Sequence, residues 1–333
     1  MDAGAPLLEV EGLEVEFSTR NGVARVLDGI ALSLQAGRTL GIVGESGCGK
    51  SMTALSIMRL VPVPPGRIGA GSVRLKGEDL LQVTEKRMRE VRGKDISMIF
   101  QEPMTSLNPV YSIGDQIAET VRLHEGLGRR DSLDRAVEML KAVHIPAAER
   151  RIREFPHQMS GGMRQRVMIA MALACQPSVL IADEPTTALD VTVQAQVFDL
   201  LKELQEKTGT AIILISHDMG VIAEMADRVM VMYAGRIVEE ASTEEILDSP
   251  KHPYTQGLIS CVPHMEEVPP PERSALTEIP GVVPALTDLA AGCSFAPRCA
   301  HAADRCRRVA PQAFEVGEDH RAACWLHDEA GTA

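Results

Sequence analysis

Four short apolar runs constrain most strongly how this 333-residue chain can fold. Each run is continuously apolar or nearly so, which is typical of strands buried on both faces of a parallel sheet. The runs occupy residues 40–43, 96–100, 179–182 and 211–215. Helical patterns lie between or beside them at residues 50–60, 163–174 and 193–207. The alternation predicts an α/β body built of packed layers.

Two regions depart from this alternation. Residues 104–154 carry helical patterning without intervening strands, and we expect an inserted helical subdomain there. After about Val238 the periodic pattern weakens, and eight prolines between residues 250 and 284 predict an extended linker. A cysteine-bearing tail follows this linker.

Charge and hydropathy exclude several classes of protein. The sequence has 34 Lys plus Arg and 46 Asp plus Glu, a formal net charge of −12, which argues against attraction of the whole surface to nucleic acid or anionic lipid. No run approaches the roughly 20 apolar residues that a membrane-spanning helix needs. The opening MDAGAPLLEV lacks the basic region and apolar core of a signal peptide. We therefore expect a cytoplasmic chain that does not cross a membrane.

The strongest motif is GESGCGKS at residues 44–51, which satisfies G-x-x-x-x-G-K-[ST] and follows the first apolar run. Its glycines let successive backbone N–H groups point at phosphate oxygens, and the next helix adds its positive end. Lys50 can reach the β- and γ-phosphates, and the Ser51 hydroxyl can bind Mg²⁺. The alternative is a glycine-rich turn that binds nothing. The candidate nucleotide-binding residues here are Gly44, Ser46, Gly47, Cys48, Gly49, Lys50, Ser51 and Met52.

Polar residues also follow three other apolar runs. Asp183 and Glu184 are adjacent carboxylates at a strand's carboxyl end, where ligands bind in such sheets. Asp183 can hold Mg²⁺, and Glu184 can orient and deprotonate an attacking water. An ordinary acid pair in a surface loop is the alternative. His217 and Gln101 follow the two remaining runs, although either residue alone would indicate nothing specific.

Four of the seven cysteines cluster near the end of the chain with the spacing C-x5-C-x6-C-x17-C. In a reducing compartment such a cluster is more often a metal or iron–sulfur site than a pair of disulfides. Four thiolates can satisfy either Zn²⁺ or a 4Fe–4S cluster, and buried free thiols are a further alternative. The candidate ligands are Cys293, Cys299, Cys306 and Cys324.

Together these motifs resemble those of the nucleotide-binding subunits of ABC (ATP-binding cassette) transporters. MSGGMRQR at residues 159–166 is similar to the family's signature loop, and TALD at residues 187–190 follows the carboxylates. The resemblance implies a P-loop ABC ATPase domain with a parallel-sheet core, an N-terminal antiparallel β subdomain and an inserted helical subdomain. It also implies a dimer in which each ATP lies between the phosphate loop of one subunit and the signature loop of the other.

The resemblance assigns a role to each matching position. Ser160, with the N–H groups of Gly161 and Gly162 at a helix start, would face the γ-phosphate from the opposite subunit. It implies that Glu184 is the general base and that His217 contacts the γ-phosphate.

The remaining positions concern the metal and the nucleotide. By the resemblance Gln101 senses the metal, so that Ser51, Gln101 and Asp183 would surround Mg²⁺, and Asp190 would contact the nucleotide. Phe17 is the candidate for stacking on adenine, and a core position in an amphipathic strand is its alternative.

Finer features are similar to the D-type ATPase subunit of dipeptide and oligopeptide importers. These are Met163 in the signature loop, where most family members have Gln, HPYT at residues 252–255 and CSFAPRC in the tail. One departure is that Ala290 and Ala291 stand where related tails often carry a proline. The resemblance divides the chain into a nucleotide-binding domain at 1–245, with its helical subdomain at about 103–175, and a C-terminal extension at 246–333.

This narrower resemblance implies cofactors and partners. It implies ATP, Mg²⁺ and a 4Fe–4S cluster in the tail, with Zn²⁺ as the alternative. The partners would be an F-type ATPase subunit, with a homodimer as the alternative, two membrane permease subunits and an extracytoplasmic solute-binding protein, but no nucleic acid. The chain would then act at the cytoplasmic face of the membrane as a peripheral subunit.

Three rival functions stay open from the sequence alone. Similar ATPase subunits serve nickel and other small-solute importers, because the cargo is selected by other chains. A soluble ABC ATPase acting on ribosomes or DNA is opposed by the single cassette and the acidic balance. A chiefly regulatory module would use its tail for sensing, with ATP hydrolysis secondary.

Overall fold

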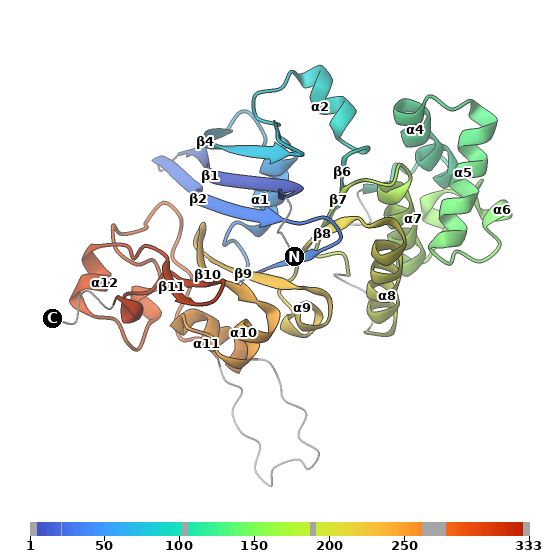
Figure 1. The fold of residues 1–333 in the computed structure, drawn as a ribbon. Helices are drawn as coiled ribbons and strands as arrows, with labels where there is room; N and C mark the ends of the chain where they lie inside the picture. Colours follow the sequence, from blue (N-terminus) through green and yellow to red (C-terminus); the bar gives the residue numbers. More distant parts are fainter. Residues whose placement is uncertain (1–4, 21, 102–105, 187–190, 262–277, 329–333) are drawn as a thin grey trace, which may run out of the picture. The chain divides into compact units, whose positions relative to one another are not determined.

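The computed structural model describes residues 5–20, 22–101, 106–186, 191–261 and 278–328. The chain forms two compact units (Figure 1). Unit 1 takes its residues from Met1–Glu9, Ser33–Thr39 and Val73–Ile215. Unit 2 takes its residues from Val10–Leu32, Leu40–Ser72 and Ser216–Ala333.

Unit 1 contains three parallel strands in the order β8-β7-β6. Their register places Val179 of β7 opposite Ile96 of β6 on one side and Ala211 of β8 on the other. Every residue of these strands is buried, which explains why their sequences are almost wholly apolar. The strands of this unit are the short β5 (Glu78–Asp79), β6 (Ile96–Ile99), β7 (Val179–Asp183) and β8 (Ala211–Ile215).

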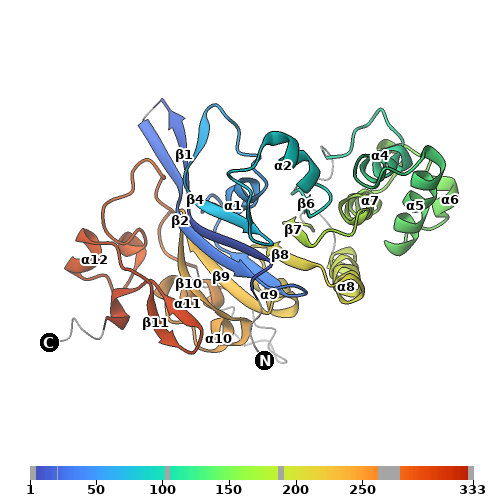
Figure 2. The same cartoon turned by 45° about the horizontal axis from the view of Figure 1, so that its top comes forward.

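The helices of unit 1 include a packed group made of α4, α5 and α7, seen on the right of Figures 1 and 2. Serine side chains start two of them: Ser112 accepts from the N–H of Asp115, and Ser160 accepts from that of Met163. The helices are α2 (Glu85–Val91), α4 (Ile113–Glu125), α5 (Arg129–Ala142), α6 (Ala148–Arg151), η1 (Pro156–Gln158), α7 (Gly161–Leu173) and α8 (Val191–Thr208). The helical patterning over residues 104–154 is confirmed where the structure describes it.

Unit 2 holds most of a four-stranded sheet with the order β2-β1-β4-β5, and it also holds the strands β3, β9, β10, β12 and β11. β9 pairs in parallel with β3, and β10 continues the sheet on the far side of β9 in the antiparallel direction. β12 then pairs antiparallel with β10, and β11 with β12. The strands are β1 (Leu8–Thr19), β2 (Gly22–Leu34), β3 (Thr39–Val43), β4 (Gly66–Leu75), β9 (Arg228–Tyr233), β10 (Arg236–Ser242), β11 (Phe314–Gly317) and β12 (His320–Ala322), and the first four each have one or more residues in unit 1.

A buried carboxylate joins three parts of unit 2. Glu239 on β10 is 1% exposed and accepts hydrogen bonds from the backbone N–H groups of Lys251 (2.6 Å) and His252 (2.8 Å). Its Oε1 also lies 2.8 Å from Nε2 of His320 on β12. A buried carboxylate is tolerated only when its lone pairs are satisfied in this way.

The prediction of an extended linker from residue 250 onward is wrong for its first part. Helix α11 occupies part of this region, and His252 caps it by accepting from the N–H of Tyr254, with Pro253 at its first position. Pro263 and the three consecutive prolines at 269–271 lie outside the described residues. The helices of unit 2 are α1 (Lys50–Ile57), α9 (Met219–Met225), α10 (Thr243–Asp248), α11 (Pro253–Ser260), η2 (Ala296–Arg298), α12 (Asp304–Arg308) and η3 (Trp325–His327).

Element ends differ by a few residues from the sequence prediction. The helix predicted over 50–60 ends at Ile57, because the chain turns at Arg59, whose φ is +51°. The strand predicted over 96–100 ends at Ile99, and Phe100 is exposed. The strands at 179–182 and 211–215 are confirmed, the first with Asp183 as an added last residue.

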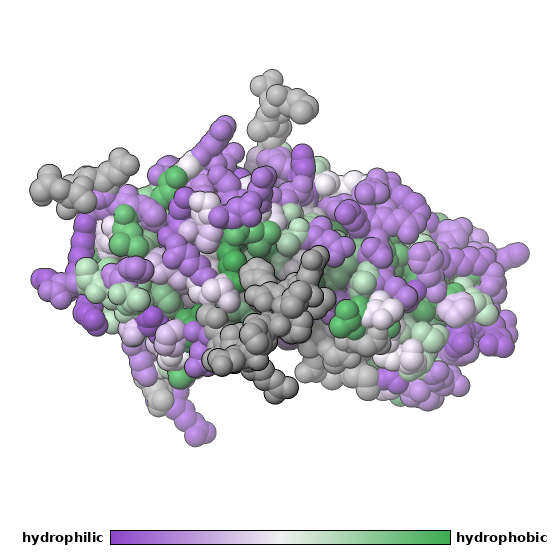
Figure 3. All heavy atoms as spheres, turned by 90° about the horizontal axis from the view of Figure 1, so that it is seen from below, coloured by the Kyte–Doolittle hydropathy of each residue, from purple (hydrophilic) through white to green (hydrophobic). Residues whose placement is uncertain are grey.

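Within the described parts of the chain, no helix combines the length and the apolarity needed to span a bilayer. The face in Figure 3 carries mainly hydrophilic side chains, with hydrophobic ones interspersed. Large apolar side chains that are exposed include Val110 and Tyr111, just before α4.

Candidate functional site

The phosphate loop of residues 44–51 lies in unit 2, between the buried strand β3 and helix α1. Gly44 packs so closely that a Cβ there would lie 2.3 Å from the Met232 carbonyl oxygen. Gly47 has φ +82°, a left-handed conformation that favours glycine. The loop therefore has the curled backbone that the motif predicts.

Lys50 is held inside the curve of this loop. Its side chain is largely buried, and Nζ donates to the carbonyl oxygens of Gly44 (2.6 Å) and Glu45 (3.2 Å). Cys48 Sγ lies 3.9 Å from Lys50 Nζ, and the Cys48 backbone oxygen accepts from the N–H of Gly235 (2.9 Å). Burial raises the pKa of the Cys48 thiol, so this side chain serves as a neutral packing group.

Two further predicted residues belong to unit 2. His217 is exposed and directly follows Ser216, whose N–H bonds the Ile42 carbonyl on β3, two residues before Gly44. Phe17 is half-buried on β1, and a Cβ on Gly66 would lie 2.9 Å from its ring. The suggested stacking of Phe17 on adenine stays a prediction.

Unit 1 brings together Gln101 and Glu184. The side-chain amide of Gln101 donates to Glu184 Oε2 at 2.8 Å, although 83 residues separate them. Glu184 has φ +46°, and its N–H bonds the Ile215 carbonyl at the end of β8. Such a conformation is uncommon for a non-glycine residue and clusters at functional sites. Asp183, the preceding residue, is 4% exposed at the end of β7.

The signature segment also lies in unit 1. Ser160 is the N-cap of α7 and its hydroxyl accepts from the Met163 N–H (3.4 Å), so the helix start has the predicted geometry. A Cβ on Gly162 would lie 2.9 Å from Val193 Cγ1, whereas nothing lies within 4 Å of one on Gly161. Asp190, with the rest of the TALD motif, lies outside the described residues.

The donor set fits ATP with Mg²⁺. A curled glycine loop ending in a helix start with Lys50 and Ser51 suits a phosphate chain. Mg²⁺ takes only one or two protein ligands beside phosphates and waters, so Ser51 and Asp183 are of the right chemical type.

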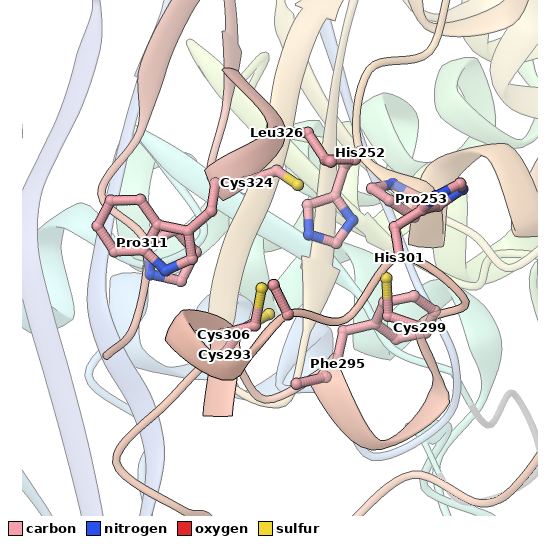
Figure 4. Close-up of a pocket in the computed structure, with 13 residues that line it drawn as sticks. His252, Pro253, Cys293, Phe295, Cys299, His301, Cys306, Pro311, Cys324 and Leu326 are labelled. Carbon is pink, nitrogen blue, oxygen red and sulfur yellow. The ribbon is translucent and has the colours of Figure 1, made fainter. Parts of the chain in front are cut away.

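The four clustered cysteines line one cavity of about 100 Å³ in unit 2, together with His252, Phe295 and Trp325. Figure 4 shows the cysteine side chains and the His252 ring around this pocket. Burial raises the pKa of the Cys293 and Cys299 thiols and raises that of Cys324 to about 11. Neutral thiols are therefore the stable form of these three residues near pH 7.

The predicted iron–sulfur cluster is corrected by this geometry. Among the residues that the structure describes, which include Cys293, Cys299, Cys306 and Cys324, no group of three or more His, Cys, Asp or Glu side chains is placed to hold a metal ion. The Zn²⁺ alternative has no support either. We therefore assign no step to a metal or cluster at these four cysteines. All seven cysteines are free.

His252 makes the stability of unit 2 sensitive to acid. Burial, and next the charge of His327, lower its pKa to about 3, and its Nδ1 accepts from the Tyr254 N–H (3.0 Å). An unfolded histidine has a pKa of about 6.5, so below that pH the unfolded chain binds the extra proton and stability falls with pH. We expect a loss of about 2 kcal/mol in unfolding free energy from pH 7 to pH 5 from this group alone.

The matched variant for this prediction is His252→Asn, because asparagine retains a capping acceptor but does not titrate. Urea unfolding of the full chain at pH 7 and pH 5 would give the two free energies. The difference should be about 2 kcal/mol smaller in the variant. An identical pH dependence of the unfolding free energy in the unmodified chain and in His252→Asn would contradict the role assigned to His252.

The structure also reveals residues that the sequence analysis did not select. Glu45 occupies a variable position of the phosphate-loop motif, so nothing in the pattern distinguishes it. Arg298, 253 residues later, forms a two-pronged ion pair with the Glu45 carboxylate. Arg298 lies between Cys293 and Cys299, and the cysteine spacing assigns no role to the residues between.

Two protein-family models match the chain. A model of the family described as ABC transporter matches residues 27–187, and one described as oligopeptide/dipeptide transporter, C-terminal region, matches residues 238–306. The chain is 53% identical to the probable peptide ABC transporter ATP-binding protein y4tR of Sinorhizobium fredii, over 97% of this chain and 96% of that protein. It is 50% identical to the oligopeptide transport ATP-binding protein OppD of Bacillus subtilis, over 96% of this chain and 88% of that one.

Solved structures agree on the fold. The dimeric bacterial ABC transporter cassette MJ0796 matches with a TM-score of 0.64 and 26% identity, over 71% of this chain and 98% of that one. The protein cbiO1 of Clostridium perfringens, part of an ABC transporter complex, matches with a TM-score of 0.62 and 26% identity, over 74% and 92%. The chain therefore has the P-loop ABC ATPase fold and belongs to the ABC transporter family of ATP-binding proteins, among relatives of the oligopeptide and dipeptide transporters.

Proposed function

We propose that this chain is the ATP-hydrolysing subunit that energises import of dipeptides or oligopeptides through a membrane ABC permease. The observation that carries the proposal is the similarity, over nearly the whole chain, to proteins named for peptide and oligopeptide transport. The match of residues 238–306 to the oligopeptide/dipeptide transporter region supports the same cargo class. The curled phosphate loop supports the nucleotide chemistry.

The roles within the nucleotide site are part of this proposal. Bound ATP with Mg²⁺ supplies the phosphoanhydride bond that water cleaves. Lys50 binds the β- and γ-phosphates, together with the backbone N–H groups of the loop that includes Ser46, Gly47, Cys48, Gly49, Ser51 and Met52. Ser51 and Asp183 would hold Mg²⁺, and Gln101 would lie among the groups that surround it.

Catalysis is assigned to three side chains. Glu184 orients the attacking water and accepts its proton, and the 2.8 Å bond from Gln101 fixes the direction of that carboxylate. His217 contacts the γ-phosphate. Because the protein forms no covalent bond to the substrate, its contribution to catalysis is positioning and charge stabilisation.

The assembly is also proposed. The dimeric state of the MJ0796 cassette supports a dimer here, in which Ser160, Gly161 and Gly162 of one subunit face the nucleotide of the other. An F-type ATPase subunit is our candidate for the second cassette, beside two permease subunits and a solute-binding protein. Attachment through these partners would place the chain at the cytoplasmic face of the membrane. Residues 1–245 would form the nucleotide-binding domain, with about 103–175 as its helical subdomain, and 246–333 the cysteine-containing extension.

Isolation of the intact membrane assembly, with mass-spectrometric identification of its subunits, tests the proposal. We expect two permease subunits, a second cassette and ATP hydrolysis that rises when a peptide-loaded binding protein is added. If ATP hydrolysis rises with a nickel-loaded binding protein but not with a peptide-loaded one, the transported solute is nickel and not peptide. Recovery of ribosomes without membrane subunits would refute the transport role.

A further inference from the structure

The C-terminal segment, defined here as residues 278–328, touches the phosphate loop inside unit 2 through Arg298. Its guanidinium donates to both carboxylate oxygens of Glu45, at 2.6 Å from Nη1 and 3.0 Å from Nη2. The Arg298 side chain is only 3% exposed. The Glu45 side chain is 29% exposed, so one side of the pair reaches solvent. A two-pronged arginine–carboxylate pair fixes direction as well as distance.

Arg298 is itself held from several sides. Its Nε donates to the Pro280 carbonyl (2.8 Å) and its Nη2 to the Ile279 carbonyl (3.1 Å). The guanidinium lies 5.9 Å from the ring centres of both Tyr233 and Phe295, within cation–π range. The charge that faces the loop is therefore anchored and not a mobile surface side chain.

A second contact reaches the same residue of the loop. The backbone N–H of Glu45 donates to the Tyr254 hydroxyl at 2.8 Å. Tyr254 on α11 is fully buried and packs edge-on against Tyr233 at 4.7 Å between ring centres. Desolvation of this buried phenol raises its pKa, so it stays neutral at physiological pH.

Both contacts bear on the groups that bind phosphate. The carbonyl of Glu45 accepts from Lys50 Nζ (3.2 Å) and from the Cys48 N–H (3.3 Å). Glu45 thus uses its carboxylate, its N–H and its carbonyl at once, and the first two are fixed by residues outside the loop. A shift of Glu45 would displace the backbone that orients Lys50.

We propose that Arg298 and Tyr254 are positioning residues that hold the phosphate loop through Glu45, so that the C-terminal segment, together with α11, sets the affinity of the chain for nucleotide. The inference rests on the proposed ATPase function and assigns to the segment a role in that same site. Loss of the contact releases the start of the loop, and nucleotide binding must then reorder it.

The test is binding of the non-hydrolysable analogue AMP-PNP with Mg²⁺ to the full chain, measured by calorimetry. We expect Arg298→Ala and Glu45→Gln each to raise Kd about tenfold. The Kd of the double variant should differ from that of either single variant by less than about twofold, because both changes disrupt the same ion pair. Tyr254→Phe, which deletes one hydroxyl, should raise Kd about threefold.

The matched control is Arg321→Ala, since Arg321 pairs with Glu315 at 2.6 Å in the same segment but with both side chains largely exposed. Its Kd should stay within about twofold of the unmodified chain. In the assembled transporter, Arg298→Ala should raise KM for ATP about tenfold while kcat changes by less than about twofold, a split that general loss of folded protein would not produce.

Wild-type Kd in a folded Glu45→Gln or Tyr254→Phe chain would overturn the proposal, and so would equal effects of Arg298→Ala and Arg321→Ala. Should Arg298→Ala not fold, those two conservative variants decide. The failure of the ATPase assignment looks different, because then the unmodified chain itself would not bind AMP-PNP.

Discussion

Replacing Glu184 by Gln should lower ATP hydrolysis by about 10²–10⁴-fold while ATP binding persists. The amide keeps the size of the carboxylate but cannot accept the proton of the attacking water. Lys50 and the phosphate loop are unchanged, so Kd for ATP should stay within about threefold. Steady-state phosphate release from the assembled transporter, together with ATP binding to the variant chain, gives the two numbers.

Gln101→Ala is the informative companion to that variant. It removes the amide that donates to Glu184 Oε2 at 2.8 Å but leaves the carboxylate. We expect a smaller fall in hydrolysis than in Glu184→Gln, because the base is present but less well directed. Hydrolysis by Glu184→Gln at the unmodified rate would contradict the assignment of the base.

Replacing Lys50 by Ala should raise Kd for ATP at least about 100-fold, because a charge-assisted contact to two phosphate groups is lost. The buried Nζ presently bonds the carbonyls of Gly44 and Glu45, so the ammonium is already directed into the loop. Equilibrium binding of Mg-ATP to the full chain would measure the effect.

A control for Lys50→Ala is Lys207→Ala on α8, whose ammonium pairs with Glu203 at an exposed position. This change should leave Kd unaffected. Undiminished ATP affinity in a folded Lys50→Ala chain would show that residues 44–51 are only a glycine-rich turn.

The sequence predicts the central strands of both units well. Strands β3, β7 and β8 could be located because residues buried on both faces must be apolar throughout, and a candidate functional residue lies at or within two residues of the end of each strand. The caps of α4 and α7 follow from Ser112 and Ser160. The pairing of Gln101 with Glu184 is a consequence of β6 and β7 lying side by side in parallel.

What the sequence could not reveal depends on contacts between distant residues. β10 contains the polar pair Glu239 and Glu240 and does not look like a buried strand; Glu239 is buried because His320, 81 residues away, and two backbone amides satisfy it. The cysteine spacing suggested a metal site, but spacing cannot distinguish ligands from thiols gathered around a pocket. The Arg298–Glu45 pair spans 253 residues and carries no local pattern.

ATP-driven peptide import can be measured as uptake of a radiolabelled oligopeptide into vesicles that hold the reconstituted complex with its binding protein. We expect uptake that requires Mg-ATP on the side of this subunit, proceeds with the unmodified chain and falls to background with Glu184→Gln. Peptide uptake that proceeds equally with Glu184→Gln, or ATP hydrolysis that never moves peptide, would contradict it.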